Sequence, residues 1–107
     1  MAELDNIFKN LPRDLSDEVF QSIATGSGVK IERIISKGHA SPAGYWYDQA
    51  QHEWVMLLAG EAMLAFESGR EQHLKAGDYL NIPAHSKHRV LWTSAECETI
   101  WLAVHYD

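Results

Sequence analysis

Hydrophobic and polar residues alternate with a period of two along most of the chain after its first quarter. The stretch 29–36 (VKIERIIS) follows this alternation, and the stretch 53–59 (EWVMLLA) is strongly apolar. Alternation of this kind is typical of β-strands that have one buried face. Further short strands are indicated over 45–49, 62–67, 70–74, 79–82, 88–92 and 98–106. Because turns containing glycine or other polar residues separate these strands, the pattern predicts an antiparallel, all-β sandwich or barrel.

The N-terminal segment follows a helical pattern instead. Ser16 is a suitable N-cap, acidic residues follow it in the first turn, and Gly26 is a suitable stop. The apolar residues form one stripe, made of Val19, Phe20 and Ile23. This pattern predicts a short helix over about residues 16–25. We therefore expect an N-terminal arm with a short helix over 1–28 and a β-barrel over 29–107, within one domain.

Composition and charge narrow the class of protein. The chain has 107 residues, of which 46% are hydrophobic, and its net charge is −6. Lysine and arginine do not cluster, so we expect no nucleic-acid partner. Cys97 is the single cysteine, which excludes an intramolecular disulfide and fits a reducing compartment. With no signal-peptide pattern and no apolar run long enough to span a bilayer, we expect a cytoplasmic protein without a membrane partner.

Residues 77–92 (GDYLNIPAHSKHRVLW) carry the densest candidate chemistry. Pro83 interrupts a strand here, because proline has no N–H to donate to a neighbouring strand. Two imidazoles, His85 and His88, follow the corner that results. A strand that continues from His88 would place Trp92 on the same face as the imidazole.

Two segments resemble the two motifs of the cupin superfamily. The run Glu53-WVMLLA-Gly60 matches the glutamate and the final glycine of the first motif at the right spacing. The run Gly77-DYLNI-Pro83-AHSK-His88 matches the first glycine, the proline and the histidine of the second motif. The chain more closely resembles small single-domain bacterial cupins. The resemblance implies a double-stranded β-helix, or jelly-roll barrel.

The first cupin motif is incomplete in this chain, because the H-x-H of the family is absent. If four residues separate it from Glu53, Trp46 and Asp48 stand at its two positions. If three residues separate it, Tyr47 and Gln49 stand there instead. The sequence leaves both alignments open.

The resemblance implies a divalent metal inside the barrel, usually held by three histidines and one glutamate. Glu53 and His88 carry over from that set. Asp48 would supply an oxygen at the second histidine position, and His85 would complete a set of two imidazoles and one carboxylate, as used for Fe(II). We therefore take Glu53, His88, Asp48 and His85 as candidate ligands for Fe, Zn, Mn or Ni.

Each of these candidates also has a purely structural interpretation. Glu53 could be a buried carboxylate fixed by a nearby arginine or tryptophan N–H. His88 could be a core histidine with its hydrogen bonds satisfied. Asp48 could cap a turn, and His85 could be a turn residue that packs beside the pocket.

Large aromatic residues are numerous for so small a barrel. They would either fill the core or leave a narrow cavity for one small ligand. The candidate pocket walls are Trp46, Trp92 and Trp101. His105 shares a strand face with Trp101 and could reach the same pocket. Trp54 is expected on the outer face, where a homodimer would cover it.

Two functions and one purely structural role, a dimer with a filled interior, remain open at this point. The first is a small enzyme that acts on a carbonyl- or acid-bearing metabolite, with a divalent metal as Lewis acid or oxygen-activating centre. Without a metal, Glu53 and His88 would still serve as a catalytic acid/base pair for isomerisation or hydration. The second is a non-catalytic module that binds or senses a small molecule through its aromatic walls and one or two polar anchors.

Overall fold

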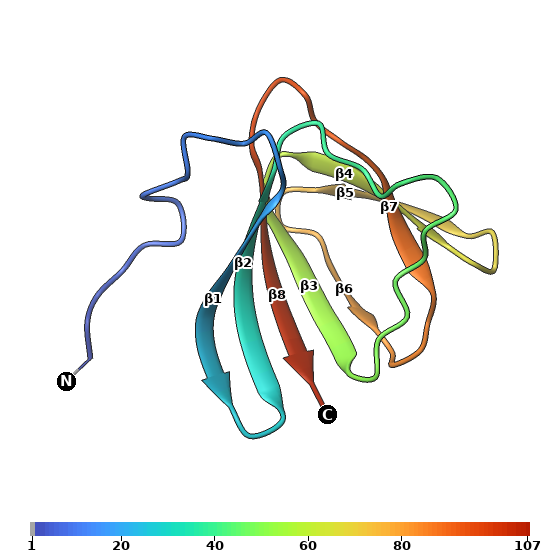
Figure 1. The fold of residues 1–107 in the computed structure, drawn as a ribbon, viewed down its shortest axis with the longest axis horizontal. Helices are drawn as coiled ribbons and strands as arrows, with labels where there is room; N and C mark the ends of the chain where they lie inside the picture. The colour runs from blue at the N-terminus through green and yellow to red at the C-terminus, as the bar shows by residue number, and fades with distance from the viewer. Residues whose placement is uncertain (1) are drawn as a thin grey trace.

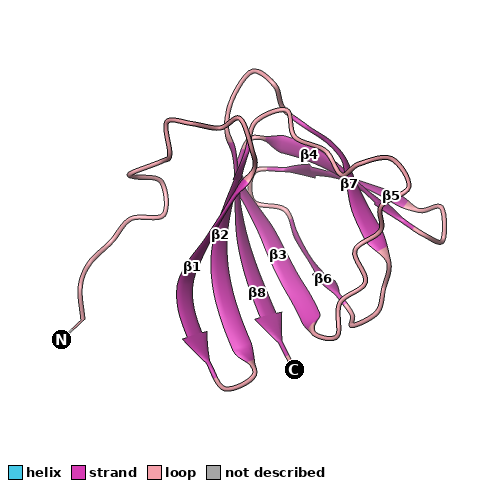
Figure 2. Ribbon diagram, viewed as in Figure 1, coloured by secondary structure: helices cyan, strands magenta, loops and turns pink. Residues whose placement is uncertain are grey.

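The structure, a computed structural model, describes residues 2–107. Within this range it consists of strands joined by turns and loops, and it contains no helix (Figure 1, Figure 2). The strands are β1 (Val19–Gly26), β2 (Val29–Ser36), β3 (His52–Ala59), β4 (Glu61–Phe66), β5 (Glu71–Lys75), β6 (Tyr79–Ile82), β7 (His88–Thr93) and β8 (Thr99–Tyr106). All paired strands are antiparallel, so the expected all-β antiparallel fold is confirmed.

The strands form two sheets that face each other across the core. One sheet has the order β1-β2-β8-β3-β6, and the other has the order β5-β4-β7. The long β2–β3 loop runs beside β7, where Tyr47 forms an isolated bridge to His88 (Figure 1). The buried core residues come from both sheets: Ile34, Val55, Leu57, Ala62, Leu64, Leu74, Ile82, Trp101 and Ala103. The alternating residues of the sequence therefore do bury one face of each sheet.

The helix predicted over residues 16–25 is wrong, because most of this segment is the edge strand β1. It pairs with β2 from Val19 opposite Ile35 to Gly26 opposite Val29. A helix of about ten residues is marginal by itself, and β-branched residues lower its propensity further. The hydrogen bonds available along β2 therefore outweigh the capping signals, which are local and weak.

Arg33 fixes the segment that precedes β1. Its side chain is buried, and its guanidinium donates hydrogen bonds to the carbonyls of Ile7 (3.1 Å), Lys9 (2.7 Å) and Asn10 (3.2 Å). Its Nε also donates to Oε1 of Gln21 in β1 at 2.8 Å. These charge-assisted bonds hold the N-terminal segment against the five-stranded sheet.

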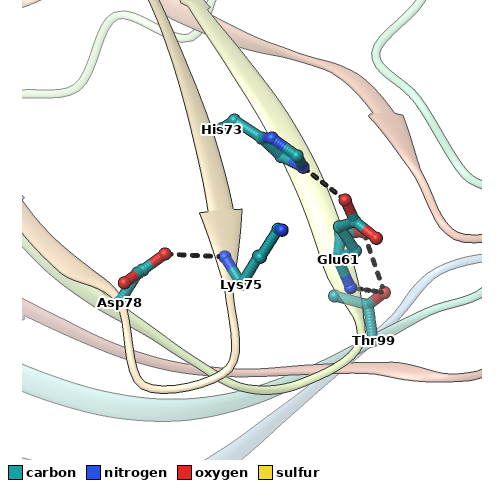
Figure 3. Close-up of polar contacts among 5 residues, drawn as sticks. All are labelled: Glu61, His73, Lys75, Asp78 and Thr99. Atoms are coloured by element: carbon teal, nitrogen blue, oxygen red, sulfur yellow. Dashed lines mark hydrogen bonds and ion pairs between the residues drawn. The ribbon is translucent and has the colours of Figure 1, made fainter.

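The β3–β4 turn requires glycine at residue 60. Gly60 has a φ of +88°, and a Cβ there would lie 2.4 Å from Oγ1 and 2.6 Å from Cα of Thr99. Thr99 Oγ1 lies 3.4 Å from both the backbone nitrogen and the carbonyl oxygen of Glu61 (Figure 3). The side chain of Glu61 points the other way and contacts His73 of β5 (Figure 3). The start of β4 is thus joined to both β5 and β8.

Candidate functional site

A cavity of about 100 Å³ lies between the two sheets and opens to solvent. Its polar lining consists of Glu18, Glu32, Tyr47, Gln49, Glu53, His88 and His105. Its apolar lining consists of Phe20, Ile34, Val55, Leu64, Ile82, Val90 and Trp101. The cavity therefore combines hydrophobic walls with several ionisable groups, a composition typical of ligand sites.

Glu53 and His88 both line this cavity and contact each other, Glu53 from one sheet and His88 from the other. Glu53 lies near the start of β3, His88 is the first residue of β7, and they are 9% and 6% exposed. Glu53 Oε1 lies 3.4 Å from His88 Nε2, which is longer than a typical hydrogen bond, and the contact is an ion pair when His88 is protonated. His88 Nδ1 lies 2.9 Å from the carbonyl oxygen of Ser86. Since a carbonyl only accepts, Nδ1 carries a proton and Nε2 faces the carboxylate.

The surroundings of His88 favour its protonated form. Burial alone would lower the pKa of the imidazole, because it removes water from the charged state. The interaction with the Glu53 carboxylate and the bond to the Ser86 carbonyl outweigh burial, and the pKa of His88 is raised above its ordinary 6.5. His88 therefore keeps its proton to a higher pH than a free imidazole does.

Tyr47 lies against His88 on the cavity wall. The two residues exchange backbone hydrogen bonds of 2.7 and 3.2 Å, and their rings stack with centroids 5.6 Å apart. Burial raises the pKa of the Tyr47 phenol, and the nearby Glu18 carboxylate, with smaller contributions from Tyr45 and Glu53, adds to this rise. The phenol therefore keeps its proton and is available as a neutral hydrogen-bond donor.

The backbone pairing of Tyr47 resolves the alignment of the first motif. Because Tyr47 and Gln49 both line the cavity, these residues stand at the two positions of the absent H-x-H. Asp48, between them, points away. Gln49 Oε1 is buried and has no hydrogen-bond partner among residues 2–107, which is unusual for an amide oxygen.

A second carboxylate–imidazole pair lies on the five-stranded sheet, which also carries Glu53. The sequence analysis did not identify this pair. Glu32 Oε1 lies 2.8 Å from His105 Nε2, and both side chains line the cavity. His105 is paired with Glu53 across β3 and β8, so the two pairs are neighbours. Glu32 also lies 3.1 Å from the half-exposed ammonium of Lys30. His105 was recognisable from the face it shares with Trp101, whereas the sequence analysis did not name Glu32 as a candidate.

A third carboxylate reaches the cavity from the N-terminal side. Ser36 Oγ donates a hydrogen bond to the carboxylate of Glu18. The indole N–H of Trp101 donates in turn to Ser36 Oγ at 3.2 Å. Trp101 is thus placed on the cavity wall, as expected, and its polar N–H is satisfied. The sequence analysis placed Glu18 in the first turn of a helix, whereas in the structure it immediately precedes strand β1.

Asp48 and His85 lie outside the cavity lining and pair with each other. Asp48 Oδ1 is 2.8 Å from His85 Nδ1, and the side chains are 41% and 69% exposed. His85 has a φ of +62°, and its backbone N–H donates to the carbonyl of Gln49. The pair joins the β2–β3 loop to the corner after Pro83. These residues therefore occupy the turn positions that were their structural alternative.

Trp46 and Trp92 also lie away from the cavity lining. Trp46 is the outward neighbour of Tyr47, and the guanidinium of Arg89 lies 5.9 Å from its ring centroid. Trp92 is 38% exposed, because a bulge in the β4–β7 pairing places Leu91 as an extra residue. The bulge reverses the alternation that began at His88, so Trp92 turns to the outer face beside His73.

The residues present do not fit the metal set that the resemblance implied. The cavity holds two carboxylate–imidazole contacts, Glu53–His88 and Glu32–His105, whereas Tyr47 and Gln49 occupy the two first-motif positions. Neutral phenol and amide groups are poor substitutes for imidazoles as ligands of a transition metal. Within residues 2–107, no three His, Cys, Asp or Glu side chains come together as a metal-binding group. We therefore derive no chemical step that passes through a metal.

Comparison with known proteins identifies the fold. The model of the Cupin domain family matches residues 33–105 of the chain. A crystal structure from Ralstonia eutropha JMP134, of a protein provisionally named mannose-6-phosphate isomerase, superposes with a TM-score of 0.95. The two sequences are 46% identical, and the match covers 99% of each chain. No curated protein sequence matches this chain.

More distant structures agree on the fold alone. A cupin superfamily protein from Desulfitobacterium hafniense DCB-2 gives a TM-score of 0.74 at 18% identity, covering 90% of this chain and 83% of that one. An RmlC-like cupin from Desulfovibrio desulfuricans gives a TM-score of 0.75 at 16% identity, covering 98% of this chain and 95% of that one.

Residues 2–107 contain no helix that is long and apolar enough to cross a membrane.

Proposed function

The chain belongs to the cupin domain family, and on that premise we propose that it is a small acid/base enzyme without a required metal. Its substrate would be a small carbonyl-bearing compound, and its reaction a proton transfer at the carbon next to the carbonyl. The observation that carries this proposal is the Glu53–His88 pair, which is buried, faces a cavity and has a raised imidazole pKa. Such pairs are candidates for general acid/base catalysis.

Each residue of the pair has a defined role in this proposal. The Glu53 carboxylate takes the proton from the carbon, while His88, protonated at Nε2, delivers a proton to the carbonyl oxygen. The product is an enediol with Glu53 protonated and His88 neutral. The reverse transfers, made to and from the neighbouring carbon and oxygen, give the isomer and restore both residues. In this proposal the neutral phenol of Tyr47, which lines the same cavity, donates a hydrogen bond to the oxygen that carries developing charge.

Non-catalytic binding of a small molecule is the second candidate. It is favoured by the residues at the two first-motif positions, Tyr47 and Gln49, which can form hydrogen bonds but are weak candidates for acid/base or metal chemistry. The same cavity would then hold a ligand without changing it. The two candidates differ in one observable, which is whether a bound compound exchanges a carbon-bound proton with water.

Proton NMR in deuterated water tests the enzyme proposal directly. Dihydroxyacetone is a suitable probe, because it is a small neutral hydroxycarbonyl compound whose carbon-bound protons are visible. We expect catalysed loss of these signals together with formation of glyceraldehyde. Glu53→Gln and His88→Asn should each slow the exchange by at least about a hundredfold.

The control variant is His73→Asn, which alters an imidazole on the outer face (Figure 3) and should leave the rate unchanged. Binding of the probe without exchange would overturn the proposed enzyme and favour the binding module.

Elemental analysis of untagged protein distinguishes a metal-dependent enzyme from the metal-free enzyme proposed here. Near-stoichiometric metal that is lost in both Glu53→Ala and His88→Ala would contradict a metal-free site.

The homodimer expected from Trp54 stays a prediction. Trp54 is half-buried, and its ring centroid lies 5.5 Å from that of Tyr79, which is 65% exposed. The two rings form an aromatic patch on the five-stranded sheet. Light scattering of the wild type and of Tyr79→Lys would show whether this patch joins two copies.

A further inference from the structure

We infer that the cavity selects a small ligand that is uncharged or singly positive, and that it rejects phosphate esters. This inference rests on the proposed function, because it names the substrate class of the same cavity. It also argues against mannose 6-phosphate, the substrate in the provisional name of the Ralstonia eutropha protein, as a ligand of this chain. Three features of the cavity support it: its charge, its size and one unsatisfied amide oxygen.

The charged groups of the cavity are mainly acidic. Three carboxylates line it, from Glu18, Glu32 and Glu53, and the lining residues of the described chain include no lysine or arginine. The two imidazoles are already committed, since each contacts a carboxylate. The ammonium of Lys30, which contacts Glu32 at 3.1 Å, is half-exposed and is not among the lining residues.

A phosphate ester would enter this site against the local charge. Proteins usually bind phosphate with arginine, lysine or the N-terminus of a helix. The cavity has none of these, since residues 2–107 form no helix and the cavity lining includes no strong cation. Repulsion between like charges is stronger in a partly buried site than in water, because the effective dielectric constant is lower. A neutral hydroxyl compound avoids this repulsion.

The volume of the cavity limits how much of a ligand it can enclose. An engineered protein cavity of about 150 Å³ holds one benzene molecule. A cavity of about 100 Å³ therefore encloses about four non-hydrogen atoms, and the rest of a ligand lies in its opening to solvent. Most of a three-carbon hydroxycarbonyl compound would be enclosed, whereas most of a hexose phosphate would lie outside.

Gln49 indicates which hydrogen-bonding groups the ligand carries. Its Oε1 is a buried acceptor without a partner in the described chain, on a side chain that lines the cavity. A hydroxyl or ammonium group on the ligand would satisfy this acceptor after a small rotation of the amide. The oxygens of a phosphate dianion cannot, because they carry no proton.

Two matched probes test the charge selection. Dihydroxyacetone and dihydroxyacetone phosphate differ by one phosphoryl group, and their dissociation constants can be measured by ligand-observed NMR titration. We expect the wild type to bind the neutral probe at least about tenfold more tightly, which corresponds to about 1.4 kcal/mol. Glu32→Gln and Glu18→Gln should each narrow this ratio, because each removes a cavity carboxylate.

The control is Glu61→Gln, which removes a carboxylate from the outer face (Figure 3) and should leave the ratio unchanged. Circular dichroism of each variant verifies folding, and the use of two cavity variants guards against loss of one. Equal or tighter binding of the phosphate ester, or no binding of the neutral probe, would overturn the inference. Tighter binding of the neutral probe without proton exchange would support the charge selection while overturning the proposed enzyme.

Discussion

Two carboxylate–imidazole pairs come from the same two segments of the chain, and they differ in almost every physical respect. Asp48 and His85 are 2.8 Å apart, whereas Glu53 and His88 are 3.4 Å apart. The closer pair is largely exposed, and the more distant pair is buried in the cavity wall. Water and dissolved ions screen the first pair but screen the second much less. Burial rather than distance therefore distinguishes the pair that lines the cavity from the pair at the surface.

The contrast also explains why spacing in the sequence is a poor guide to a site. His85 and His88 are three residues apart, and Asp48 and Glu53 are five apart. In each case one residue faces the cavity and the other faces solvent. The outer pair joins two loops, and the inner pair joins β3 of one sheet to β7 of the other. The outer pair thus holds the corner after Pro83, and the inner pair forms part of the cavity wall.

The largest expected difference between the two pairs is in stability. His88→Ala should lower the free energy of unfolding by about 3 kcal/mol, because it leaves the buried Glu53 carboxylate without its partner. His85→Ala should lower it by less than about 1 kcal/mol, because an exposed ion pair contributes little. Urea unfolding followed by tryptophan fluorescence measures both values. Similar losses for the two variants would contradict the importance of burial.

The pH dependence of stability should follow the inner pair. The pKa of His88 is raised in the folded protein, so the folded state binds this proton more tightly than the unfolded state does. The stabilisation is fully present below the ordinary pKa of 6.5 and is lost as the pH rises through the higher folded-state pKa. Urea unfolding in a series of buffers should show this decline in wild type. A decline that persists unchanged in His88→Asn would assign it to another group.

The imidazole of His88 should titrate at lower pH when its partner loses its charge. In Glu53→Gln the attraction of the carboxylate is gone, while the burial that lowers the pKa of His88 remains. Proton–nitrogen NMR of the histidine side chains measures this change. Glu61→Gln is the matched control. It removes the carboxylate that contacts His73 on the outer face (Figure 3), so the titration of His88 should stay unchanged. An unchanged titration of His88 in Glu53→Gln would show that the ion pair is not formed in solution.

The smallest expected effect concerns the outer corner. His85 has a φ of +62°, a conformation that glycine adopts without strain. His85→Gly should therefore change the free energy of unfolding by no more than about 1 kcal/mol, with loss of the surface ion pair offset by relief of backbone strain. Urea unfolding of this variant beside His85→Ala isolates the backbone contribution. If glycine were less stable than alanine here, the left-handed backbone would not be the source of strain.

The sequence predicted more of the fold than of the site. The alternation of apolar residues located the strands from β2 to β8, and the glycine turns located most of their ends. The strand predicted over 45–49 is wrong, because this segment is a loop with a single isolated bridge at Tyr47. Glu53 and His88 were identified because two short motifs placed them. The N-terminal helix failed, because its capping signals are local and β2 offers a partner strand that no local pattern reveals.

The cavity lining depended on pairings that the sequence does not contain. Glu32 and His105 meet because β2 and β8 are neighbours, although 73 residues separate them along the chain. Trp92 turns outward because of a bulge between β4 and β7. Tyr47 and Gln49 face inward because the loop before β3 pairs with His88.

By itself, the amino-acid sequence determined that this chain forms short antiparallel strands, and it proposed two carboxylates and two imidazoles, of which Glu53 and His88 line the cavity. These features are local, because side-chain periodicity and turn residues act over a few positions. The tertiary structure alone decided which polar groups share the cavity and which meet water. The reason is that a strand's register and each bulge are set by hydrogen bonds to strands distant in sequence, and a shift of one residue reverses the direction of every side chain that follows.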